Sequence, residues 1–340
     1  MRYTSFENRL TQARNAAKNW DERLFGTSQE GRPIIGFYRQ GRGPKILAWA
    51  LMHGNEPTGF EALLQLMASE VQGTWCILPI LNPDGAEAFT RLNARGMDVN
   101  RDARLQATAE AQALEACRSW FQPDIALNLH DQRPRFYPKG GTLPSSFSLL
   151  APKGHPEEST ESQINAQAIL HAWATHLTGK HPGQVARFDD AFYPTAFGEY
   201  FQESGCATIT FETGISPADW ERVSVAQSEY ECLKSLDVHA AEWMASSQRS
   251  AYLDLPMNAS PANEWVIAHA DGHCHLRLLE SVQNGMYSVK WEVDDFQADH
   301  PTWLTSETST SLAHLVAGTV LDVDYFESLG ISVPTIGLKN

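Results

Sequence analysis

Apolar residues in the first 247 positions of the chain fall into two alternating patterns. Short continuous apolar runs predict buried strands at residues 45–51, 75–81, 124–129 and 207–211. Apolar residues that recur every three or four positions predict helices at residues 5–20, 58–71, 106–121, 161–177 and 219–245. A turn-rich stretch at residues 26–33, followed by apolar residues 34–38, indicates a hairpin. Strands that alternate with helices predict an α/β fold with a mixed, mostly parallel, doubly wound sheet flanked by helices.

The pattern changes after a polar stretch at residues 246–250, where the helical spacing stops. Short alternating segments follow at residues 265–269, 274–279, 286–293 and 319–325. The dipeptide Asn284-Gly285 precedes one of them and is a strong hairpin signal. The sequence therefore predicts two domains, a large α/β domain at residues 1–247 and a small antiparallel β domain at residues 251–340.

Charge and composition narrow the classes of partner. The chain of 340 residues has 26 basic and 41 acidic side chains and a net charge of −15, and residues 251–340 hold three of the basic and twelve of the acidic ones. Nucleic acids and anionic membranes are bound through basic surfaces, so neither is expected as a partner. The N-terminal segment lacks the apolar stretch of a signal peptide, and the five scattered cysteines form no CxxC pair. We therefore predict a soluble, cytoplasmic protein.

Histidine and glutamate side chains follow two of the predicted strands. His53 and Glu56 come after the strand at residues 45–51, and His130 comes after the strand at residues 124–129. Because the carboxyl ends of parallel strands share one edge of a sheet, these side chains can meet there. Three His and Glu ligands with a fourth position open are typical of a catalytic zinc ion. Taken alone, His53 and Glu56 also fit a polar strand end and a helix cap.

Two further features suit the hydrolysis of an amide. The loop at residues 82–101 holds Arg91, Arg95 and Arg101, and guanidinium groups bind carboxylates and stabilise a developing oxyanion. These arginines are either a small positive site in an acidic protein or solvated surface residues. Glu212 follows the last buried strand, where a carboxylate can take a proton from water and pass it to a leaving nitrogen. A turn or helix cap is the alternative role for Glu212.

Together these segments resemble the zinc carboxypeptidase family of metallopeptidases over residues 24–215. The motifs occur in the family's order: a GxSxEGRPI-like stretch at residues 26–34, HGNE at 53–56, NPDG at 82–85, RxN at 91–93, GxDxNR at 96–101, the strand-end His130, and TxE at 210–212. The resemblance implies one zinc ion held by His53, Glu56 and His130, with Glu212 as general base and acid.

The resemblance also implies roles in substrate binding. Arg91 matches the arginine that polarises the scissile carbonyl, and Asn100 and Arg101 match the pair that holds the substrate's terminal carboxylate. Tyr193 is the best match to a tyrosine that closes over the substrate. Tyr200 is the alternative, because the spacing is not a clean fit to the family.

The predicted function is zinc-dependent hydrolysis of a peptide or amide bond next to a free carboxylate, as in a metallocarboxypeptidase. Asp131-Gln132 stands where digestive members have a serine-containing continuation, so the chain looks more like bacterial intracellular members. Those members include enzymes that cleave the γ-D-glutamyl-diaminopimelate bond of murein peptides. Glu199 is either a partner for a substrate ammonium group or a surface glutamate.

Two other functions stay open from the sequence. An N-acyl amino acid amidohydrolase similar to succinylglutamate desuccinylase or aspartoacylase shares HGNE and a C-terminal β domain, although NPDG followed by RxN favours the peptidases. A non-catalytic protein that binds zinc or peptides is the alternative from another class. The presence of every expected ligand and of the base argues against it. The oligomeric state is left open.

Overall fold

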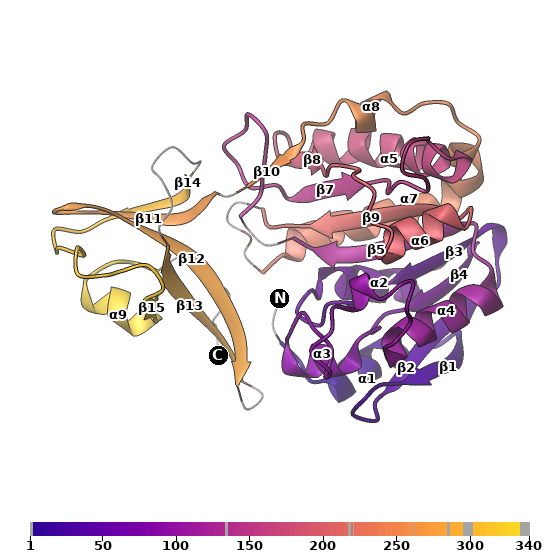
Figure 1. Cartoon of the computed structure of the whole chain (residues 1–340), viewed down its shortest axis with the longest axis horizontal. Coiled ribbons are helices and arrows are strands. Elements are labelled where there is room, and N and C mark those ends of the chain that lie inside the picture. The colour runs from indigo at the N-terminus through magenta and orange to yellow at the C-terminus, as the bar shows by residue number, and fades with distance from the viewer. Residues whose placement is uncertain are drawn as a thin grey trace.

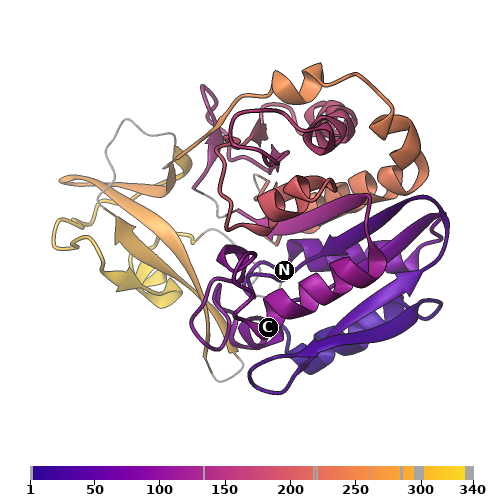
Figure 2. The ribbon, with the colours of Figure 1, turned by 45° about the vertical axis from the view of Figure 1, so that its right-hand side comes forward.

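The fold is described from a computed structural model, which covers residues 3–132, 135–216, 219, 221–260, 262–283, 286–294 and 302–333. The Asn284-Gly285 dipeptide lies outside the described residues. In both views a large sheet with its helices stands beside a smaller sheet formed by the C-terminal part of the chain (Figures 1 and 2).

The large sheet has eight strands in the order β1-β2-β4-β3-β5-β9-β7-β8. Their bounds are β1 Asp21–Thr27, β2 Pro33–Arg39, β3 Arg42–Trp49, β4 Gly73–Leu78, β5 Ile125–Asp131, β7 Phe147–Leu150, β8 Val185–Arg187 and β9 Ala207–Thr213. Strands β4, β3, β5 and β9 are parallel neighbours, whereas β1, β2 and β7 join antiparallel. The predicted mixed, mostly parallel sheet is confirmed.

Helices cover both faces of this sheet. The core on one face includes α1 Phe6–Ala16, α2 Thr58–Ala68, α5 Glu161–Lys180 and α7 Val223–Met244, and the core on the other includes α4 Ala109–Phe121 and α6 Phe197–Glu203. Strand β3 shows why two layers form: Ile46 and Ala48 enter the first core, while Leu47 and Trp49 enter the second. The continuous apolar run is therefore a strand buried on both faces, as in other parallel sheets.

The sequence pattern missed some short elements. The loop at residues 82–101 contains a helix, α3 Pro83–Ala88, and the 3-10 turn Val99–Arg101. Asn82 starts α3 by accepting a hydrogen bond from the backbone N–H of Gly85, with Pro83 in the first turn. Strands β7 and β8 were not predicted, because four and three residues are too few for an apolar period to show.

The C-terminal sheet has the order β14-β11-β12-β13-β15. Its strands are β11 Asn263–His269, β12 Gly272–Gln283, β13 Met286–Asp294, β14 Thr302–Glu307 and β15 Val320–Leu321. Strand β14 pairs parallel with β11, so the small sheet is not wholly antiparallel as predicted. The predicted strand at residues 319–325 is also wrong in its second half. Asp322 accepts a hydrogen bond from the backbone N–H of Tyr325 and starts the helix α9 Val323–Ser328 there.

The segment between the two sheets packs on the larger one. It contains α8 Ser250–Leu253 and β10 Asn258–Ala259, and β10 pairs with β6 Tyr137–Pro138. Tyr252 is buried in the core of the large sheet, and its hydroxyl accepts a hydrogen bond from the backbone N–H of Ala151. Among the described helices, none is long and apolar enough to cross a membrane.

Candidate active site

The carboxyl edge of the large sheet gathers the predicted site residues. His53 follows β3, His130 lies near the end of β5, and Glu212 lies near the end of β9. The three strands are neighbours, and His130 and Glu212 are register partners across the β5–β9 ladder. This is the edge at which open α/β sheets bind ligands.

His53, Glu56 and His130 form one compact group. One ligand atom from each side chain lies within 4.8 Å of the others, and all three residues are buried. Nδ1 of His53 lies 3.0 Å from Oε1 of Glu56, and Nδ1 of His130 lies 2.8 Å from Oε2 of the same carboxylate. Two imidazole nitrogens and a carboxylate that converge in this way fit the donor set of a catalytic zinc ion, with a further position left for water or substrate.

The outer nitrogen of each imidazole has its own neighbour. Nε2 of His53 lies 3.0 Å from Oδ1 of Asp98, and Nε2 of His130 lies 3.5 Å from Nδ2 of Asn100. The backbone N–H of Asp131 donates to Oε2 of Glu56 at 3.2 Å. Such outer contacts fix the orientation of a metal-binding imidazole. Asp98 lies in the GxDxNR stretch, but no role was predicted for it.

The two histidines of this group differ in pKa. Burial disfavours the His53 imidazolium, but Glu56 and Asp98 outweigh burial and raise the pKa of His53 to about 9. Burial lowers the pKa of His130, despite its contact with Glu56. Burial also opposes ionisation of Glu56, yet the two histidines hold the pKa of that carboxyl well below its usual range. The group therefore carries an ionised carboxylate between the two rings.

Glu212 is a carboxyl group of a different kind. Burial and, after it, the negative charge of Glu56 raise the pKa of Glu212 to about 8. A carboxyl group with a pKa near neutrality can both accept and release a proton at physiological pH. Glu212 thus differs in protonation behaviour from Glu56, although both lie at the same cavity.

A cavity of about 310 Å³ joins these residues. Its lining residues are His53, Asn55, Glu56, Arg91, Asn100, Arg101, Asp131, Gln132, Phe136, Phe188 and Glu212. Six of the eight predicted site residues therefore line one cavity. His130 is not a lining residue but contacts Glu56, which is one. Asn55, Asp131, Gln132, Phe136 and Phe188 were not predicted as pocket residues, and for the two phenylalanines no motif pointed to them.

The three arginines of the loop after β4 separate in the structure. Nη1 of Arg91 lies 3.3 Å from Oε1 of Glu56, and its Nη2 lies 3.0 Å from Oδ2 of Asp98. Arg101 lines the cavity and donates from Nη1 to the backbone carbonyl of Asn100. Arg95 does not line the cavity and donates to the backbone carbonyl of Ala107 instead. The positive site thus contains two of the three arginines.

Neither candidate tyrosine lines the cavity. The Tyr193 side chain is 59% exposed, and the next residue, Pro194, accepts a hydrogen bond at its backbone carbonyl from Nε of Arg104. The ring of Tyr200 packs against Phe201 and the second core, and it lies under the guanidinium of Arg118. The substrate-closing role of Tyr193 remains a prediction.

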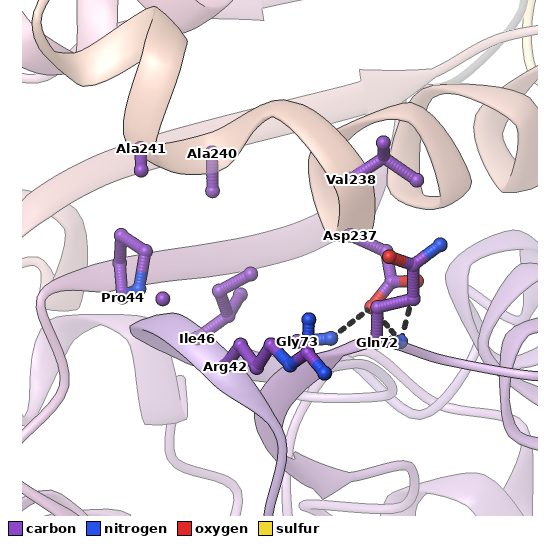
Figure 3. Close-up of a pocket in the computed structure, with 10 residues that line it drawn as sticks. Arg42, Pro44, Ile46, Gln72, Gly73, Asp237, Val238, Ala240 and Ala241 are labelled. Carbon is purple, nitrogen blue, oxygen red and sulfur yellow. Dashed lines mark hydrogen bonds between the residues drawn. The ribbon is translucent and has the colours of Figure 1, made fainter.

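Two other cavities do not bring together histidine, glutamate and arginine side chains in this way. A cavity of about 180 Å³ opens at the amino-terminal ends of β3 and β4, the opposite edge of the sheet (Figure 3). The carboxylate of Asp237 in it accepts the backbone N–H groups of Gln72 and Gly73 and Nε1 of Trp75, which ties α7 to β4. On the C-terminal sheet, His273 and His275 line a hollow of about 470 Å³. Among the described residues, the group of His53 is the one set close enough to hold a metal ion.

Comparison with known proteins identifies the fold. No protein-family model and no curated protein matches the sequence. A solved metallo-carboxypeptidase from Burkholderia cenocepacia matches 69% of this chain and 68% of its own length, at 17% identity and a TM-score of 0.54. A metallo-carboxypeptidase from Pseudomonas aeruginosa in complex with (2-guanidinoethylmercapto)succinic acid matches over 70% and 69%, at 18% identity and a TM-score of 0.54. A succinylglutamate desuccinylase from a Silicibacter species matches over 65% and 66%, at 18% identity and a TM-score of 0.50.

The chain therefore has the fold of the metallo-carboxypeptidases, which the desuccinylase shares. The resemblance stated from the motifs is confirmed at the level of the fold. At identities of 17% and 18%, the likeness extends no further than the fold, and the chemistry rests on this chain's own residues.

Proposed function

We propose that the protein is a zinc-dependent hydrolase of the metallocarboxypeptidase type, which cleaves a peptide or amide bond next to a free carboxylate. The observation that carries this proposal is the cavity of about 310 Å³. It is lined by His53 and Glu56, which form one group with His130, by the half-buried carboxyl group of Glu212, and by Arg101. A catalytic metal, a proton acceptor and a carboxylate anchor are the parts that such a hydrolase needs.

His53, Glu56 and His130 would hold the zinc ion, and Asp98 would keep the His53 ring in place. When bound, zinc supplies a Lewis acid that polarises a carbonyl and makes water more acidic. Glu212 takes the proton from the attacking water and gives it to the departing nitrogen, a double role that suits its raised pKa of about 8.

The arginines orient the substrate in this proposal. Arg101, with Asn100 beside it, holds the substrate carboxylate and so sets which bond lies at the metal site. Arg91 lies against Glu56 and Asp98, where its charge can stabilise the carbonyl oxygen as negative charge develops there. The five cysteines are all buried and free, which supports a reducing compartment such as the cytoplasm.

The test combines metal analysis with a hydrolysis panel. Purified protein is expected to hold one zinc ion per chain and to release free amine from peptides with a free C-terminus or from N-acyl amino acids. The matched control is the same panel with the terminal carboxylate amidated, which should react much more slowly. Protein that carries zinc but hydrolyses neither series contradicts the proposal.

A further inference from the structure

The residues that line the cavity differ in charge and polarity from one end of the cavity to the other, along the edge of the sheet. Arg91 and Arg101 come from the loop after β4. The metal-type group, which is the set of His53, Glu56 and His130, follows β3 and ends β5. Phe136 and Phe188 belong to the opposite end: the Phe136 carbonyl accepts from the backbone N–H of Ser145 just before β7, and Phe188 donates to Leu149 in β7. Since the sheet order is β4-β3-β5-β9-β7-β8, the cavity has an arginine end and an aromatic end.

The aromatic end offers carbon surface to a ligand. The rings of Phe136 and Phe188 stand edge to face with centroids 5.5 Å apart, and both residues are half-buried. They are the two hydrophobic side chains among the residues that line the cavity. A group that is bound there loses water from apolar surface, so an apolar group gains more than a polar one.

This end of the cavity offers no cation to an anionic group. Asp131 is already paired with Arg222, whose Nη1 lies 2.6 Å from its Oδ2. Arg135 and Arg187 each precede one of the two phenylalanines in sequence, but neither is among the residues that line the cavity, and Arg135 lies 3.5 Å from the carboxylate of Asp294 in β13. A second carboxylate of the substrate at this end would therefore lose its water against two phenylalanine rings without a lysine or arginine among the described lining residues of this end to replace it.

The polar side chain at this end is that of Gln132, a neutral amide held in one orientation. Nε2 of Gln132 donates to the Ser145 carbonyl at 2.5 Å, and Oε1 accepts from Nδ2 of Asn258 in β10 at 2.8 Å. The Ser145 hydroxyl closes the ring by donating to Oδ1 of Asn258 at 2.7 Å. Because the Ser145 carbonyl can only accept a hydrogen bond, the nitrogen of the Gln132 amide must face it, and the flipped orientation of the amide is excluded. Gln132 thus presents hydrogen-bonding groups without charge.

From this arrangement we propose that the acyl side of the substrate is uncharged and apolar and packs on Phe136 and Phe188. This inference rests on the proposed function. The carboxylate, on the amine side of the scissile bond, lies at Arg101, and the scissile carbonyl lies at the metal-type group. The acyl group therefore extends to the aromatic end. Water adds across the amide, and the products are an apolar carboxylic acid and an amino acid or peptide with a free amine. Substrates with an anionic acyl group, such as succinyl, are poor.

The test compares N-benzoyl and N-succinyl derivatives of the same set of amino acids, with release of free amine as the readout on zinc-loaded protein. Wild type is expected to show at least about tenfold higher kcat/KM for the benzoyl series, the scale of one apolar contact. Phe136→Ala and Phe188→Ala should each lower kcat/KM for the benzoyl series by about tenfold, mainly through KM, and leave the succinyl series little changed.

The control variant is Phe25→Ala, which removes a half-buried phenylalanine on β1 that contacts Trp120 of α4 and does not line the cavity. It should leave the benzoyl-to-succinyl ratio as in wild type. Zinc content and far-UV circular dichroism confirm that each variant is folded. Preference for the succinyl series, or a ratio that neither cavity variant changes, overturns the inference but leaves the proposed function standing. Failure of the wild type on both series and on the peptides with a free C-terminus overturns the proposed function itself.

Discussion

Nε2 of His53 lies 3.0 Å from the carboxylate of Asp98, while Nδ1 of the same ring lies 3.0 Å from Glu56. The ring is thus held at both nitrogens, and one of the two contacts comes from outside the metal-type group. Asp98 also accepts a hydrogen bond from the backbone N–H of Asn100, so one carboxylate links the metal-type group to the carboxylate anchor.

Asp98→Ala is therefore expected to weaken zinc binding, because the His53 ring loses the group that orients it. The dissociation constant for zinc should rise about 10- to 100-fold, as is typical when such an outer contact is removed. Competition with a chromophoric chelator measures it. Asp254→Asn, at an exposed position, is the control and should bind zinc as wild type does. Unchanged affinity in Asp98→Ala would mean that Glu56 and packing fix the His53 ring without Asp98.

Glu212→Gln separates the chemical step from metal binding. Gln keeps the shape of the side chain but cannot accept a proton, so kcat should fall by about 10²- to 10⁴-fold. Zinc content should stay at the wild-type level, because Glu212 is not in the group of His53, Glu56 and His130. Steady-state kinetics and metal analysis on the same preparation give both quantities. Near-normal turnover in this variant would remove Glu212 from the mechanism.

Arg101→Met tests the carboxylate anchor. Loss of a charged hydrogen bond to the substrate should raise KM by about 10- to 100-fold, with a smaller effect on kcat. The matched comparison uses a substrate whose terminal carboxylate is amidated: wild type and variant should then react alike, since the lost partner is absent from both. Arg95→Met is the control, because Arg95 lies outside the cavity. A penalty that persists with the amidated substrate would contradict the anchor role.

The candidate site was more predictable from sequence than its surroundings. His53, His130 and Glu212 each follow or end a buried apolar run, and parallel strands bring such ends to one edge whatever the loops do. Asp98 and Phe188 reach the site through loops, whose paths depend on tertiary contacts that no local period records. Tyr193 is exposed for the same reason. The position of Tyr193 in the order of motifs does not determine whether its loop directs the ring toward the cavity.

Glu199 is a buried carboxyl group outside the metal-type group, and its pKa should make the stability of the protein depend on pH. The residue is 5% exposed, and burial raises its pKa to about 7, against 4.5 for an accessible glutamate, despite the lowering effect of backbone N–H groups and Arg101. The folded state therefore holds this proton more tightly than the unfolded state does. Below about pH 4.5 Glu199 is protonated in both states, and it does not lower the free energy of unfolding. As the pH rises toward 7 the unfolded state ionises first, and the free energy of unfolding falls.

Glu199→Gln removes this pH dependence, since Gln stays neutral in both states. Above pH 7 the variant should be more stable than wild type by up to about 3 kcal/mol, and near pH 4 the two should differ little. Urea denaturation at pH 4.5, 6 and 8 in the presence of a chelator measures the difference without a contribution from bound metal. Glu70→Gln, at an exposed position, is the control and should follow the wild-type curve at every pH. If Glu199→Gln also ran parallel to wild type, the Glu199 carboxylate would be paired in the folded state, and a substrate ammonium would then have no unpaired charge to meet there.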